Sequence, residues 1–334
     1  MRVHAKILGL FASVLVAMTM SSQTQPFEYS KNATSAPACS ASTLPNPNQL
    51  ALLRWYRANQ TATFPAGVSP LGMAFDGSNV WVVNSGSNTV MKIRASDGEL
   101  LSTTNVGHVP GYAAFDGENV WVTNLNDNTV SKIQASTGTV VATIATGKLP
   151  WGIAFDGTNI WVGNITDGTV SKIRATTGTV VGTFASGMIP ISLAFDGTNI
   201  WVTNQGGANT VTKIKASNGS IAGTFTVGEN PVGVAFDGTS VWVANSNSNT
   251  VTRLNASTGA VLGTFNVGTS PQFIVFDGAN IWVQNQGSNT ITELSDCSGA
   301  LLGTFKTGKQ PTGIAFDGAN VWVSNTKDGT ISKQ

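Results

Sequence analysis

One motif recurs seven times along the chain and constrains the fold more than any other feature. Each copy has a proline, then a segment close to Ala-Phe-Asp-Gly, then a tryptophan. The prolines are Pro70, Pro110, Pro150, Pro190, Pro231, Pro271 and Pro311, spaced 40 residues apart except for one step of 41. A fixed period of this length indicates a repeat architecture, in which each copy forms one structural unit.

The copy that starts at Pro150 shows how one unit is built. Four short runs rich in β-branched and aromatic residues alternate with turn residues, and each run predicts a strand. The predicted strands are residues 152–155, 160–163, 169–173 and 180–184. No helical period interrupts them. Four antiparallel strands in about 40 residues are typical of a β-propeller blade.

The two ends of the repeat region predict how the ring closes. The seventh copy reaches Gln334 after its third strand, while residues 63–70 match residues 264–271, which include a fourth strand. We expect residues near 61–66 to complete the last blade, which removes two open sheet edges. The sequence therefore predicts an all-β, seven-bladed propeller over residues 61–334, with four antiparallel strands per blade and the last blade closed by an N-terminal strand.

The residues before the ring predict export. Arg2 and Lys6 precede an apolar run over residues 7–18, which is too short to span a bilayer but typical of a secretory signal peptide. We predict a signal peptide at residues 1–21. The mature protein is then expected to be secreted, periplasmic or on the cell surface, with no transmembrane span.

A flexible extension is predicted over residues 22–60, because its first half is rich in Ser, Thr, Ala and Pro. A short helix is predicted near 47–58, where Leu50, Leu53 and Tyr56 share one helical face. Such a helix can pack on the ring.

The chain has two cysteines, Cys39 in this extension and Cys297 in a predicted turn of the sixth copy. Export permits a disulfide between them, which would tie the extension to the ring. Two free thiols are the alternative.

Charge narrows the range of partners. Charged residues make up 10% of the chain and the formal net charge is +1. Because no basic stripe is present to attract phosphates, we expect no nucleic-acid partner. We expect a monomer.

Two known families resemble this repeat. Trp-Val-Thr-Asn at residues 121–124 and Thr-Val-Ser-Lys-Ile at 129–133 resemble the YVTN family of β-propeller repeats, and the resemblance covers residues 61–334. It implies an exported propeller. The repeat is more loosely similar to the streptogramin lyases of the virginiamycin B lyase type. That similarity implies a lyase with histidine and glutamate around a divalent metal, and His108 is the only histidine beyond the signal region.

The copies differ mainly on one face, at the loops that follow the second strand and precede the next proline. Blades two to four gather apolar and aromatic residues there, whereas blades five to seven stay mostly polar. An asymmetric apolar patch of this kind indicates a binding surface, and the alternative is that the side chains pack together under the loops. The predicted ligand-binding residues are Val109, Tyr112, Leu125, Leu149, Trp151, Ile165, Met188, Ile191 and Phe273.

The same face holds few groups able to do acid–base chemistry. His108 could act with Glu229 or Asp127, although turn chemistry is the first explanation for Asp127. Calcium-binding loops, zinc-ligand spacings and phosphate loops are absent, so no metal site is predicted. We expect no cofactor, and a divalent cation only under the lyase alternative.

These observations favour an exported binding module that recognises a protein, glycan or small-molecule ligand through one loop face. Catalysis is not favoured but stays open, and a lyase or hydrolase on the same face is the first alternative. A cell-surface structural protein is the second.

Peptide mapping tests the predicted disulfide. Digestion of the exported protein without reduction should release one linked pair of peptides that contain Cys39 and Cys297. Recovery of both cysteines in separate, alkylated peptides would exclude the bond.

Overall fold

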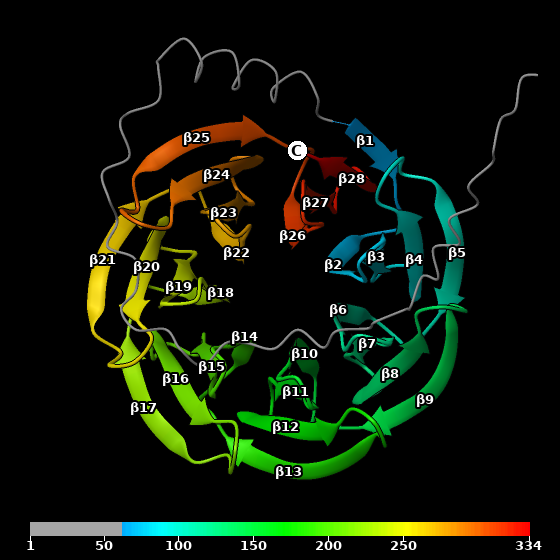
Figure 1. Cartoon of the computed structure of the whole chain (residues 1–334), viewed down its shortest axis with the longest axis horizontal. Helices are drawn as coiled ribbons and strands as arrows, with labels where there is room; N and C mark the ends of the chain where they lie inside the picture. The colour runs from blue at the N-terminus through cyan, green and yellow to red at the C-terminus, as the bar shows by residue number, and fades with distance from the viewer. Residues whose placement is uncertain (1–61) are drawn as a thin grey trace, which may run out of the picture. The chain divides into compact units, whose positions relative to one another are not determined.

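The structure, a computed structural model, describes residues 62–334. They form seven sheets of four antiparallel strands, arranged as the blades of a ring (Figure 1). This confirms the predicted fold class. None of these residues is helical, so none belongs to a helix long enough to cross a membrane. The predicted signal peptide, the extension with its helix near 47–58, and Cys39 lie outside the described residues.

Each blade runs from an innermost strand to an outermost one. The innermost strands are β2 (Pro70–Phe75), β6 (Pro110–Phe115), β10 (Pro150–Phe155), β14 (Pro190–Phe195), β18 (Pro231–Phe236), β22 (Pro271–Phe276) and β26 (Pro311–Phe316). The second strands are β3 (Asn79–Asn84), β7 (Asn119–Asn124), β11 (Asn159–Asn164), β15 (Asn199–Asn204), β19 (Ser240–Asn245), β23 (Asn280–Asn285) and β27 (Val321–Asn325).

The third and fourth strands lie farther out. The third strands are β4 (Thr89–Arg94), β8 (Thr129–Gln134), β12 (Thr169–Arg174), β16 (Thr210–Lys215), β20 (Thr250–Asn255), β24 (Thr290–Ser295) and β28 (Thr330–Lys333). The outermost strands are β5 (Leu100–Asn105), β9 (Thr139–Ala145), β13 (Thr179–Ala185), β17 (Ile221–Thr226), β21 (Val261–Asn266), β25 (Leu301–Lys306) and β1 (Ala62–Pro65).

The ring closes as predicted. β1 pairs antiparallel with β28, with Phe64 opposite Ile331, and so completes the seventh blade. The Phe64 ring stacks on the Trp322 indole at a centroid distance of 5.6 Å. Trp322 and Ile331 share a hydrophobic core with Met73 and Val80 of blade one, which joins the last blade to the first.

The core lies between the blades rather than within them. Seven hydrophobic clusters each join two neighbouring blades, as Trp121 and Val130 of blade two join Ile160 and Ile173 of blade three. A strand such as β11 is buried on both faces, so consecutive apolar residues occupy it rather than an alternating pattern.

The aspartate of each repeat has two structural roles. In blade one, Asp76 Oδ1 accepts hydrogen bonds from the backbone N–H groups of Ser78 and Asn79 and so holds the turn. Its Oδ2 accepts a hydrogen bond of 2.8 Å from the indole Nε1 of Trp81. The indole bond recurs in all seven blades. The aspartate therefore holds the turn, and the indole bond adds a role in the core.

A cation covers the same tryptophan in six blades. Lys132 Nζ lies 5.2 Å from the centroid of the Trp121 ring and donates a hydrogen bond of 2.8 Å to the carbonyl of Ala175 in the next blade. This one side chain adds a cation–π contact and a link between blades. Blade six has Glu293 at the corresponding position.

The Asp317→Asn variant tests the aspartate–indole bond. Burial raises the pKa of Asp317, but hydrogen bonds from Trp322, Asn320 and Ala319 outweigh it and hold this pKa below its ordinary value. The ionised carboxylate therefore stabilises the fold at neutral pH, and its contribution is lost as the pH falls below about 4. We expect the variant to lose about 1 kcal/mol at neutral pH.

Urea denaturation at several pH values measures this effect. The difference in unfolding free energy between wild type and Asp317→Asn should shrink as the pH falls from about 5 to about 2.5. Glu118→Gln, which changes an exposed carboxylate, is the control and should change little. A difference that does not depend on pH would contradict the assigned role.

Candidate functional site

The innermost strands all begin at the repeat proline, on one face of the ring, and a cavity of about 310 Å³ lies where these ends converge. Five of the nine predicted binding residues line it: Tyr112, Trp151, Ile165, Ile191 and Phe273. The other lining residues are Leu71, Gln205, Val232, Gln272, Gln286, Gln310 and Thr312. We call these twelve residues the mouth.

Three aromatic rings from different blades meet in the mouth. The Tyr112 ring lies 5.3 Å from the Trp151 ring in an edge-on arrangement and 4.6 Å from the Phe273 ring. Tyr112 also reaches blade seven, where its hydroxyl donates a hydrogen bond of 3.3 Å to the carbonyl of Thr312. One side chain of blade two thus crosses the mouth and contacts blades three, six and seven.

The position of Tyr112 depends on glycine in the neighbouring blade. The residue two after the proline is Gly72 in blade one, and a Cβ there would lie 2.6 Å from the Tyr112 Cα. Gly233 has the same relation to Phe273, at 2.7 Å from its Cα. Tyr112 and Phe273 therefore fit in blades two and six because the neighbouring blade has a glycine, which lacks a side chain, at the equivalent position.

Side chains of the second strand fix the backbone beneath the rings. Thr123 Oγ1 accepts a hydrogen bond from the Tyr112 N–H at 3.0 Å and donates one to the Trp151 carbonyl at 2.9 Å. Burial raises the pKa of the Tyr112 hydroxyl far above its ordinary value. Tyr112 therefore stays protonated and serves as a fixed, neutral wall.

Glutamines form the polar part of the mouth. Gln272 donates from Nε2 to Ser246 Oγ at 2.9 Å. The side-chain amides of Gln205, Gln286 and Gln310 make no hydrogen bond to the part of the chain that the structure describes. The mouth therefore offers amide donors and acceptors among apolar side chains, and none of its twelve residues is charged.

Four predicted binding residues do not line the mouth. Val109 and Leu149 directly precede the proline, where the backbone has a positive φ of 51° and 52°. They lie at the rim of the mouth without lining it, and Leu149 is exposed. Met188 is also exposed, and Leu125 is half-buried beside Gly111.

The lining residues that sequence reasoning missed share a clear signal. Leu71, Val232, Gln272 and Thr312 occupy the position directly after the proline, as Trp151 and Ile191 do. Gln205 and Gln286 follow the repeat asparagine, as Ile165 does. Reading these two positions around all seven blades would have found most of the mouth, polar residues included.

The candidate acid–base residues lie outside the mouth. His108 Nδ1 and Asp127 Oδ1 are 2.8 Å apart on the exposed surface, and Asp127 Oδ2 accepts a hydrogen bond from the His108 backbone N–H. These contacts lower the pKa of Asp127. Asp167 and Asp328 accept the same backbone bond in their blades, which supports turn chemistry for this position. Glu229 is in blade five, where its backbone N–H donates to Ser248 Oγ.

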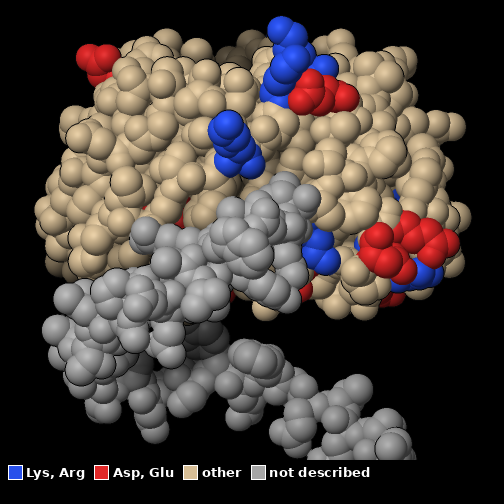
Figure 2. Space-filling model, turned by 90° about the horizontal axis from the view of Figure 1, so that it is seen from above, with Lys and Arg blue, Asp and Glu red and all other residues tan. Residues whose placement is uncertain are grey.

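Charge is sparse elsewhere too. Lys, Arg, Asp and Glu are few and scattered on the side of the molecule that Figure 2 shows. Within residues 62–334, no group of three or more His, Cys, Asp or Glu side chains is placed to hold a metal ion. Cys297 lies in the turn between β24 and β25, and its predicted pairing with Cys39 extends beyond the described residues.

Comparisons with known proteins support the fold. No family model and no curated protein matches the chain. Among solved structures, the hydrazine synthase of Kuenenia stuttgartiensis is similar, with a TM-score of 0.72 and 17% sequence identity over 80% of this chain and 95% of that chain. A likeness at this identity shows the propeller fold alone.

Substitution of Val109 tests the strain at the rim. Bulky and β-branched residues rarely adopt a positive φ, whereas asparagine tolerates it, and Asn230 occupies this repeat position in blade five. Val109→Asn should therefore stabilise the protein by about 1 kcal/mol. The reverse change, Asn230→Val, is the matched control and should destabilise by a similar amount. Urea denaturation measures both, and a destabilised Val109→Asn variant would contradict the interpretation.

Proposed function

We propose that the protein is an exported binding module that takes a neutral glycan at the mouth of its ring. The observation that carries the proposal is the composition of the mouth. Aromatic and aliphatic side chains line the cavity together with four glutamines, and no charged side chain contributes.

The neutral lining selects an uncharged ligand. A charged group that entered the mouth would lose contact with water and meet no opposite charge, which costs free energy. A hydroxyl group both donates and accepts hydrogen bonds, and a glutamine amide can do both through its two terminal atoms. A ligand rich in hydroxyl groups therefore suits Gln205, Gln286 and Gln310, which have no side-chain partner within the described residues.

The aromatic part of the mouth suits the same ligand class. A sugar ring has an apolar face of C–H groups, which packs on flat apolar surface. Trp151 is half-buried and its ring is held by Tyr112, so it offers such a surface with little motion left to lose on binding. Ligand sites of this kind combine apolar walls with a few placed polar groups.

Backbone strain at the rim supports a role for blades two to four. The position before the proline has a positive φ in every blade, and three blades place Val109, Leu149 and Ile189 there. Asparagine or serine at this position would cost less conformational free energy. Strained positions are kept most often where a surface has a function, so these apolar rim residues support a contact surface around the mouth.

The proposal also includes secretion of the protein and its relation to the YVTN repeat family. The apolar segment at residues 7–18 supports secretion, and the resemblance to YVTN repeats supports placing the protein among exported propellers.

Binding to a panel of neutral and acidic oligosaccharides tests the proposal. Wild-type protein should bind neutral members, and Trp151→Ala should weaken that binding about tenfold or more, as expected for a buried aromatic anchor. Gln286→Ala should also weaken it. Val181→Ala is the matched control, because Val181 is exposed on β13 and does not line the mouth. Neutral glycan binding that is unchanged in Trp151→Ala and Gln286→Ala would contradict the proposal, as would binding to acidic members alone.

A further inference from the structure

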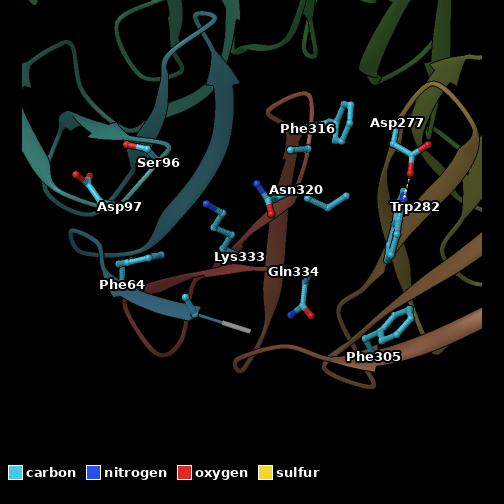
Figure 3. A pocket seen from close by; sticks show the side chains of 13 residues that line it. Phe64, Ser96, Asp97, Asp277, Trp282, Phe305, Phe316, Asn320, Lys333 and Gln334 are labelled. Atoms are coloured by element: carbon cyan, nitrogen blue, oxygen red, sulfur yellow. Dashed lines mark hydrogen bonds between the residues drawn. The ribbon is translucent and has the colours of Figure 1, made fainter. Parts of the chain in front are cut away.

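A second cavity, of about 420 Å³, lies on the opposite face of the ring, between blades six, seven and one. Four aromatic side chains line it: Phe64, Trp282, Phe305 and Phe316. In Figure 3, Trp282 and Phe305 lie on one side of the β27–β28 ribbons and Ser96 and Asp97 lie on the other, with Lys333 and Gln334 between them.

The cavity lies where one repeated structural element is missing. In six blades a turn joins the third strand to the fourth, and a carbonyl of this turn accepts the Lys or Arg side chain of a preceding blade. In blade seven these strands are β28 and β1, which come from opposite ends of the described ring, so no such turn joins them. The junction between blades six and seven therefore lacks the turn that fills the other six junctions.

Blade six departs from the repeat beside this gap, where an acidic side chain replaces a cation. Glu293 stands where the other six blades have Lys or Arg, pairs in register with Trp282 and is buried. Trp282 itself lines the cavity.

We propose that residues 47–58 of this chain dock in this cavity and take the place of the missing turn. The chain enters the ring at Ala62, which itself lines the cavity. Residue 58 lies four residues before Ala62, so an extended linker places it within about 14 Å of that position. A segment that ends so near the cavity reaches it at little cost in loop-closure entropy.

The chemistry of the segment matches that of the cavity. Leu50, Leu53 and Tyr56 share one face of the predicted helix and complement the aromatic lining. Arg54 and Arg57 give the same segment two positive charges, which complement the acidic Glu293. A cation from the N-terminal segment thus replaces the lysine that the repeat lacks in blade six.

Limited trypsin digestion of the full chain tests the docking, because trypsin cuts after Arg54 and Arg57. In the native wild type, both bonds should be cut at least about tenfold more slowly than in the same protein unfolded in urea. Glu293→Gln should remove much of this protection. Glu118→Gln, which alters an exposed glutamate elsewhere, is the control and should keep it.

A second variant keeps the test independent of ring stability. Leu53→Ser changes only the segment, and both bonds should then be cut nearly as fast in native protein as in urea. Rapid cutting of the native wild type would overturn the proposal. Protection that persists in both Leu53→Ser and Glu293→Gln would also overturn it, because some other surface would then hold the segment.

Discussion

Every blade depends on one hydrogen bond between a repeat aspartate and the indole of the second strand. The indole is almost fully buried in the core between blades, where an unpaired N–H costs about 1–3 kcal/mol. The carboxylate that accepts it also holds the turn between the first two strands, as Asp76 does with Ser78 and Asn79. A single residue type therefore couples the turn, the tryptophan and the core. This coupling explains why the aspartate and the tryptophan recur without exception.

Because the outer blade and its core are fixed by these repeated contacts, variation is tolerated where the innermost strands begin. There the side chain of the residue after the proline lines the mouth in six of the seven blades. Tyr112 shows the consequence, since one substitution of the usual glycine lets a side chain cross the mouth to Thr312. The same scaffold can thus carry aromatic and aliphatic side chains at some positions of the mouth and glutamines at others.

The repeat period was sufficient to predict the fold, the strand order within a blade and the closing strand, because each depends on local pattern or on copy number. The mouth was predicted only in part. Val109 and Leu149 do not line the mouth, whereas Gln310 at the equivalent repeat position does, so position in the repeat alone does not decide which side chain reaches the cavity. Contact between Tyr112 and Phe273 joins blades two and six, which are distant in sequence, so only the closed ring reveals it. Glu293 is visible as a departure from the repeat, but its importance depends on the gap beside blade seven.

The central claim is that scaffold and binding site are separable, with the site confined to the irregular residues of the mouth. The most direct test gives blades three and four the residues that blade seven has at the same repeat positions, Thr312 and Thr326. The triple variant Trp151→Thr, Ile165→Thr, Ile191→Thr should keep the wild-type far-ultraviolet circular dichroism spectrum and cooperative unfolding, and lose binding to neutral glycans. A folded variant that binds those glycans as tightly as the wild type would contradict the account.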